Sequence, residues 1–243
     1  DASVYQIKPL GVVLPKDTND VLSLMEYSQK NSVPLLARGG GSSQCGQTVG
    51  ESVVLDYSKH QNKILELNVE EKYVWVQPGV VLDHLNDYLK PHGLWFPVDV
   101  STSSRATIGG MSANNSCGSR SLYYGNMVHN VLAIEAILDD GSIFNFDQIN
   151  KNYLATKNNQ DRLYKIIDKF IDVRQQVGGE IDANWPTTQR RVGGYNIDLI
   201  DPEGFNSSNL LVGSEGTLSL FKKIKLKLSE IPKNKILVVC YFD

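Results

Sequence analysis

The sequence has few cysteines, and they form none of the patterns that fix a disulfide framework or a metal cluster. Its 243 residues contain three, Cys45, Cys117 and Cys240, at wide spacing and without a C-x-x-C pair. This usage argues against a small secreted scaffold and against an iron–sulfur cluster held by this chain. We therefore expect a protein of a reducing compartment, with the cytoplasm as its location.

Other features that mark particular classes of protein are absent as well. The 4 histidines are scattered, with no pair four residues apart, so we predict no metal site. The formal net charge is −3 and there is no basic tract, which leaves nucleic-acid binding without electrostatic support. No apolar run approaches the roughly 20 residues of a membrane span, and we expect no signal peptide. The length and the 41% hydrophobic residues indicate a globular protein with ample core.

Glycine, in contrast, is concentrated in three short stretches. The first is the loop 38–47 (RGGGSSQCGQ), which follows an apolar run at 33–37 that predicts a buried strand. The others are 108–115 (IGGMSANN) and 213–217 (GSEGT). Without side chains, consecutive backbone N–H groups can converge on phosphate oxygens. The first stretch alone could be a plain turn between strands, but three such loops predict a long ligand that carries phosphate.

The first loop matches neither of the two common phosphate motifs. The dinucleotide fingerprint G-x-G-x-x-G lacks its third glycine, because Gln44 stands there. Residues 41–48 approach the triphosphate motif G-x-x-x-x-G-K-T, but Gln47 occupies the lysine position and carries no charge. The triphosphate interpretation is therefore weak.

The segment before the first loop predicts a parallel β-α-β unit. A strand at 11–15 is followed by a helix that Asp17 or Thr18 can cap, and then by the strand at 33–37. A ligand crevice is expected at the carboxyl end of such a unit, where the glycine loop lies.

The rest of the chain alternates strands and helices around one long polar stretch. Residues 97–127 are rich in Ser, Thr, Asn and Gly, which predicts a long functional loop. An amphipathic helix is expected to begin near Leu163 and to end at Gly178–Gly179. Further strands are predicted at 52–56, 63–67, 73–77, 130–138, 142–146, 218–228 and 235–243, and a helix with Leu82, Leu85 and Leu89 inward stops at Gly93.

Taken in order, these motifs resemble a known family. The run Arg38-Gly-Gly-Gly, the segment 76–80 (VQPGV), the second glycine loop with its continuation to Gly125, and residues 212–218 (VGSEGTL) look like the FAD-binding (PCMH-type) domain of the vanillyl-alcohol oxidase/p-cresol methylhydroxylase superfamily. The most similar branch is that of the FAD-linked D-lactate, glycolate and D-2-hydroxyglutarate dehydrogenases. The turn 190–196 (RRVGGYN) is similar to large members fused to an iron–sulfur module.

The resemblance implies an α+β fold in which a small β-α-β subdomain packs against a larger subdomain with a mixed or antiparallel sheet and flanking helices. It divides the chain into residues 1–56 with the pyrophosphate loop, residues 57–230 as the second FAD-binding subdomain, and residues 231–243 as the start of a substrate-capping domain. The cofactor-binding residues that it implies are Arg38, Gly39, Gly40, Gly41, Ser42, Ser43, Gly46, Gln47, Pro78, Gly79, Val80, Ser101, Thr107, Ile108, Gly109, Gly110, Ala113, Asn115, Gly118, Tyr124, Glu215, Gly216 and Thr217.

Two departures from the family pattern carry further expectations. Relatives with covalent flavin have a histidine shortly after the arginine–glycine run, whereas this chain has Ser42, so the FAD is expected to be non-covalent. The chain stops about where the family's capping domain begins, so the catalytic base and any metal ligands are expected outside it. Arg190, Arg191 and Arg105 are candidates for binding a substrate carboxylate, and no catalytic residue is assigned.

The predicted function is thus the FAD-binding part of an enzyme that oxidises a 2-hydroxy acid of the D-lactate, glycolate or D-2-hydroxyglutarate type by hydride transfer to FAD. The expected partners are that small-molecule substrate and an electron acceptor that no motif identifies. The alternatives are the FAD domain of a sugar or aldonolactone oxidase or of an enzyme similar to UDP-enolpyruvylglucosamine reductase, and a non-catalytic nucleotide-binding module.

Overall fold

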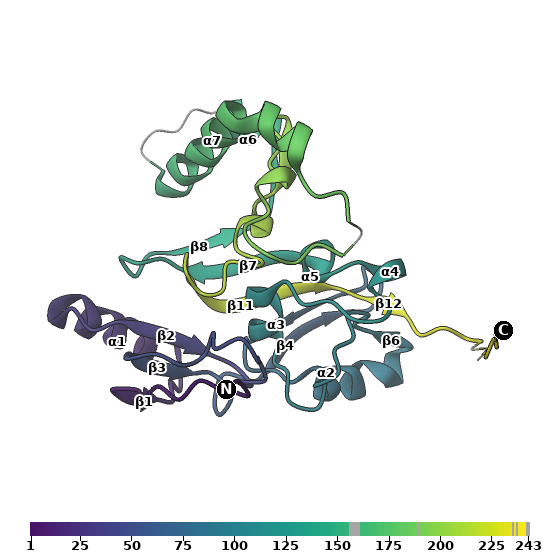
Figure 1. The fold of residues 1–243 in the computed structure, drawn as a ribbon, viewed down its shortest axis with the longest axis horizontal. Helices are drawn as coiled ribbons and strands as arrows, with labels where there is room; N and C mark the ends of the chain where they lie inside the picture. Colours follow the sequence, from purple (N-terminus) through teal and green to yellow (C-terminus); the bar gives the residue numbers. More distant parts are fainter. Residues whose placement is uncertain (156–160, 189, 235, 237, 242–243) are drawn as a thin grey trace.

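The computed structural model describes residues 1–155, 161–188, 190–234, 236 and 238–241. Its first layer is a small parallel sheet with strand order β1-β3-β2, which Figure 1 shows in purple with α1 beside it. The elements are β1 (Gly11–Val13), α1 (Thr18–Asn31), β2 (Leu35–Arg38) and β3 (Val53–Asp56). The predicted parallel unit is present, but β3 lies between the two strands that α1 connects.

Helix α1 begins where the sequence predicts. The Asp17 side chain accepts hydrogen bonds from the backbone N–H groups of Asn19 and Asp20, which satisfies donors that the first helical turn leaves free. The apolar face of α1, with Val21 and Met25, packs in one cluster with Ile137 and Leu220 of the larger sheet. The small sheet and the large sheet therefore share a core through α1.

The larger sheet is antiparallel throughout, with strand order β4-β5-β11-β7-β8. Its strands are β4 (Ile64–Asn68), β5 (Tyr73–Val76), β7 (Val131–Ile137), β8 (Ile143–Phe146) and β11 (Leu220–Lys227). Strand β11 lies in the middle of the sheet, although it comes near the end of the chain. A small pair is formed by β6 (Leu94–Trp95) and β12 (Ser229–Glu230).

One face of this sheet is covered by short helices that build the main core. Helix α2 (Leu82–Leu89) buries Leu82, Leu85 and Leu89 as predicted, and after the turn η1 (Lys90–His92) the chain reverses at Gly93. The predicted long loop 97–127 instead contains α3 (Ile108–Asn114) and α4 (Ser121–Tyr124), followed by α5 (Met127–Asn130). The expectation of an irregular loop is therefore wrong, because Ile108 and Met111 belong to the core.

A separate helical unit, green in Figure 1, lies on the other side of the large sheet from the small one. It comprises α6 (Lys151–Ala155), α7 (Arg162–Asn184), η2 (Ile197–Leu199), η3 (Ser207–Leu210) and the pair β9 (Gln148–Asn150) and β10 (Gly204–Asn206). Its own core includes Ile167, Ile171 and Phe205.

Helix α7 does not end at Gly178–Gly179 as predicted, but continues to Asn184. Buried Ile181 lies beyond the glycines, and its packing offsets the roughly 1 kcal/mol per residue that glycine costs a helix. The strand predicted at 235–243 is also not found, because Ile236 and residues 238–241 are in no strand, and the other residues of that range are not described.

No helix in the described ranges combines the length and the apolar composition that crossing a membrane requires. In the same ranges, no three His, Cys, Asp or Glu side chains gather where they could hold a metal ion.

Candidate functional site

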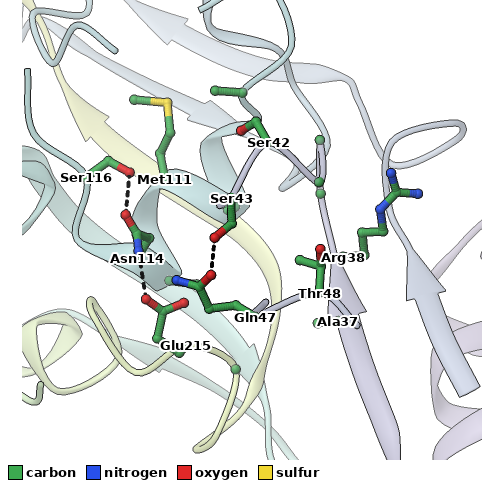
Figure 2. Close-up of a pocket in the computed structure, with 18 of the residues that line it drawn as sticks. Ala37, Arg38, Ser42, Ser43, Gln47, Thr48, Met111, Asn114, Ser116 and Glu215 are labelled. Carbon is green, nitrogen blue, oxygen red and sulfur yellow. Dashed lines mark hydrogen bonds between the residues drawn. The ribbon is translucent and has the colours of Figure 1, made fainter. Parts of the chain in front are cut away.

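A cavity of about 410 Å³ lies where the small sheet meets α3 and the start of β11. Its walls come from distant parts of the chain, because the first glycine loop, the second glycine loop and the loop before β11 all reach it. Figure 2 shows Arg38 and Thr48 on one side of this cavity, and Asn114, Ser116 and Glu215 on the other. The three glycine stretches of the sequence are therefore brought to one site.

The first loop leaves β2 with its backbone donors free. Within the described part of the chain, the N–H groups of residues 39–43 donate no hydrogen bond to any other residue. Consecutive free amides on a cavity wall form a positive concavity that suits an anion. The Ser43 hydroxyl donates to Gln47 Oε1, which holds the far side of the loop (Figure 2).

The three glycines at the start of this loop serve different needs. A Cβ at Gly40 would overlap the carbonyl oxygen of Arg105, and one at Gly39 would overlap the Thr107 hydroxyl. These two glycines therefore let the first loop lie directly on the segment before α3. Gly41 has φ = +61°, in the left-handed region that other residues rarely adopt.

The N-terminal residues hold this loop from outside the cavity. The Ala2 N–H donates to the Ser43 carbonyl oxygen at 2.9 Å, and the Thr48 hydroxyl donates to the Asp1 carboxylate at 2.9 Å. At the loop's base, Arg38 Nη1 lies 3.0 Å from Asp56 Oδ2. The loop is thus tied to the rest of the protein at both ends.

The third loop reaches the cavity through contacts with α3. The N–H groups of Gly213 and Glu215 donate to the carbonyl oxygens of Ser112 and Ala113, each at 2.9 Å. Glu215, at φ = +52°, then accepts a hydrogen bond from Asn114 Nδ2 at 2.7 Å. The hydroxyls of Tyr195 and Thr217 lie 2.7 Å apart, which joins the turn 190–196 to the same loop.

Three polar atoms of cavity residues are buried without a partner in the described structure. They are Arg38 Nε, the Tyr57 hydroxyl and the Ser219 hydroxyl. Burial raises the pKa of Tyr57 far above its usual value, so its phenol stays protonated and can donate. A buried polar group without a partner costs free energy, which a ligand with matching acceptors would recover.

Many of the residues predicted from the family resemblance line this cavity, and others lie outside its lining. Those in the lining are Arg38, Gly39, Gly40, Gly41, Ser42, Ser43, Gln47, Pro78, Ser101, Gly109, Gly110, Ala113, Glu215 and Gly216. Those outside the lining are Gly46, Gly79, Val80, Thr107, Ile108, Asn115, Gly118, Tyr124 and Thr217.

Several of the predicted residues outside the lining support the loops that form it. Thr107 caps α3 by accepting from the Gly110 N–H, and Asn115 Oδ1 accepts from the Val128 N–H at 3.0 Å. A Cβ at Gly79 would overlap the Tyr57 carbonyl oxygen, so the segment 78–80 lies close against the chain after β3. Tyr124 instead lines a second cavity of about 380 Å³, together with Trp95 and Arg120 among others.

Two of the candidate arginines, Arg190 and Arg191, lie beside the cavity but not in its lining, whereas Val192 of the same turn is in the lining. Arg191 forms an ion pair with Asp198, and its guanidinium carbon lies 5.0 Å from the centre of the Trp185 ring. Arg190 Nη2 donates to Cys117 Sγ at 3.2 Å.

Sequence reasoning missed lining residues that follow from strand pairing rather than from a motif. Tyr57 comes directly after β3, and β3 pairs with β2 in parallel, so Tyr57 and the first glycine loop meet at the same edge of the sheet. The position of Tyr57 after a predicted strand was the available signal. Ser219 and Phe221 reach the cavity because β11 is the central strand of the large sheet.

The comparisons with known proteins agree with this geometry. The family described as "FAD binding domain" matches residues 9–147, more than half of the chain. D-2-hydroxyglutarate dehydrogenase of Haemophilus influenzae is 35% identical over an alignment of 251 positions, which covers 98% of this chain and 24% of that protein. Glycolate oxidase subunit GlcD of Bacillus subtilis is 27% identical over 98% of this chain and 41% of that protein.

Among solved structures, alkyldihydroxyacetonephosphate synthase superposes with a TM-score of 0.62 at 20% identity, covering 92% of this chain and 34% of that one. This likeness confirms the predicted α+β fold and nothing beyond the fold. This chain spans about a quarter of the length of the D-2-hydroxyglutarate dehydrogenases that it matches. The chain belongs to the family of FAD-binding domains, and its cofactor is FAD.

Proposed function

We propose that the cavity between the small sheet and α3 holds the FAD, and that the chain is the flavin-binding part of a 2-hydroxyacid dehydrogenase. The observation that carries the proposal is the row of free backbone N–H groups at residues 39–43 on the cavity wall. An FAD pyrophosphate is an anion that such a row of donors suits.

The residues of the cavity fit the two other parts of the cofactor. The hydroxyls of Tyr57 and Ser219 are buried without partners in the described structure, and both residues line the cavity together with apolar Phe221, so we assign them to the adenosine end. The walls formed by Gly109, Gly110 and Glu215 would hold the ribityl chain and the flavin ring. Ser42 carries no imidazole that could attach to the ring, so the proposal includes a non-covalent flavin.

The substrate class is inferred from the relatives. D-2-hydroxyglutarate dehydrogenases and the glycolate oxidase subunit are named for 2-hydroxy acids, and they match almost the whole of this chain. A bound flavin accepts hydride from the carbon that carries the hydroxyl group. This chain's residues would hold and orient the flavin and keep water from one side of its ring, which strengthens the polar contacts there.

Other parts of the expected function stay predictions. They are the division into subdomains at residues 56/57 and 230/231, the electron acceptor, a fused iron–sulfur module and the cytoplasmic location. A base that takes the hydroxyl proton has to lie within hydrogen-bond reach of the substrate, and we assign no residue of this chain to that role.

The test is anaerobic mixing of the flavin-loaded gene product, read from its own start codon to its own stop codon, with D-2-hydroxyglutarate, D-lactate and glycolate. The visible flavin band reports reduction, and we expect one of these acids to bleach it fastest. Bleaching by aldoses or aldonolactones alone would contradict the proposed substrate class. A gene product that binds no flavin would contradict the proposal as a whole.

A further inference from the structure

Two neighbouring arginines in the turn 190–196 have opposite surroundings. The guanidinium of Arg191 is paired with the Asp198 carboxylate and lies over the Trp185 ring. The Arg191 side chain is only 25% exposed, so its charge is neutralised by a partner within the protein. Arg190 is exposed, and its hydrogen bond goes to the Cys117 sulfur at 3.2 Å. A thiol is a weak acceptor, so Arg190 keeps almost all of its donor capacity.

The contact with Cys117 places the Arg190 guanidinium at the rim of the cavity. Cys117 lines the cavity, and so does Val192, two residues after Arg190. Ser116, the neighbour of Cys117, lies with Asn114 and Glu215 on the side opposite Arg38 and Thr48 (Figure 2). Arg190 therefore approaches the cavity from the wall that faces the first glycine loop. No carboxylate of the described residues pairs with it.

We propose that Arg190 binds a carboxylate of the 2-hydroxy acid at the rim of the flavin cavity. The inference rests on the proposed function, since it names the group that recognises that function's substrate. A planar guanidinium presents parallel N–H donors that match the two oxygens of a carboxylate. The substrate carboxylate would replace the Cys117 sulfur as the acceptor for Arg190, because a charge-assisted hydrogen bond is stronger than one to a thiol.

The other anion near this site is the pyrophosphate of the cofactor. Its partners are already supplied by the free amides of residues 39–43 on the opposite wall. Arg190 is thus a binding residue for substrate and not for cofactor, and the two roles predict different measurements.

The experiment uses the flavin-loaded gene product and its Arg190→Gln and Arg190→Lys variants. Oxalate, a carboxylate that flavin does not oxidise, is titrated while the visible flavin spectrum is followed, and reduction rates are measured with each 2-hydroxy acid. We expect Arg190→Gln to raise the oxalate Kd and the half-saturating acid concentration about tenfold, as loss of one charged hydrogen-bond partner does. The Arg190→Lys variant is expected to recover part of this loss, and the FAD content of both variants is expected to stay unchanged.

Arg105→Gln is the matched control. Arg105 is also exposed and stands between two cavity residues, Thr102 and Ala106, but among the described residues its side chain forms no hydrogen bond or ion pair with the lining. Equal weakening by Arg105→Gln and Arg190→Gln would overturn the inference in favour of general electrostatic attraction. A lower FAD content with unchanged oxalate affinity would overturn it in favour of a cofactor role. If Arg190→Gln binds oxalate as tightly as the wild type, the assignment of Arg190 is overturned, whether or not any acid is oxidised. A flavoprotein that none of the acids reduces would contradict only the proposed function.

Discussion

Replacing Gly41 by valine is expected to destabilise the fold and to weaken FAD binding at the same time. The backbone of Gly41 is left-handed, with φ = +61°. A Cβ on this residue would lie 2.6 Å from Arg38 Nη2 and 2.7 Å from Arg38 Nε. The guanidinium would then have to move away from Asp56, to which it is bound at 3.0 Å.

The size of the effect follows from these two contributions. A left-handed backbone costs an ordinary residue roughly 1–2 kcal/mol. Loss of the Arg38–Asp56 pair adds only about 0.5 kcal/mol, because the Arg38 side chain is partly exposed and water screens its charge. We expect the free energy of unfolding to fall by about 2 kcal/mol, which lowers Tm by about 4–8 °C in a chain of this size.

Thermal unfolding and a fluorescence titration with FAD measure the two effects. The FAD Kd should rise at least about tenfold, because a change in the left-handed backbone of Gly41 would move the neighbouring free amides that are proposed to bind the pyrophosphate. The control is Gly179→Ala in α7, where an added Cβ meets no atom within 4 Å. It should raise the stability by roughly 0.5–1 kcal/mol and leave FAD binding unchanged. An unchanged Tm and FAD Kd in Gly41→Val would refute the assignment of the loop.

Three further predictions concern the cofactor. The chain should bind FAD more tightly than FMN, because FMN lacks the adenosine that the Tyr57 and Ser219 hydroxyls are proposed to meet; calorimetry giving equal affinities would contradict this. Acid precipitation should leave the yellow flavin in the supernatant, since Ser42 offers no attachment, and colour in the pellet would show a covalent bond. Tyr57→Phe should stabilise the flavin-free chain by about 1 kcal/mol, because it removes a buried hydroxyl without an acceptor. The same variant should bind FAD more weakly, and a loss of flavin-free stability would show that the hydroxyl has an internal partner.

The secondary structure could be predicted wherever local chemistry decides it. Asp17 caps α1 because its side chain reaches the first amides, and Leu82, Leu85 and Leu89 share one face of α2 through their spacing alone. Helix α3 was not predicted, because the pair Gly109–Gly110 is typical of a loop. Gly109 is there for packing, since a Cβ would lie 2.5 Å from Pro78 Cβ.

Only those parts of the site that form continuous sequence motifs could be predicted. The resemblance placed the three glycine loops together, and they do line one cavity. Tyr57 was signalled only by its position after a predicted strand, and Ser219 had no signal of its own. Their place at the cavity depends on two pairings between distant segments. β3 lies between β1 and β2, and β11 lies between β5 and β7, which no local pattern reveals.

The structure also changes the interpretation of the glycine run that opens the site. The sequence suggests that all three glycines make room for a phosphate, but Gly39 and Gly40 make room for the segment 105–107 of the protein itself. Protein packing therefore sets the path of the loop, and the contacts of Ser43 and Thr48 with residues 1–2 hold its far end. Amides that are already in place lose little freedom when an anion arrives, which lowers the entropic cost of binding. Substitutions that loosen this packing should accordingly weaken FAD binding even where they touch no part of the cavity.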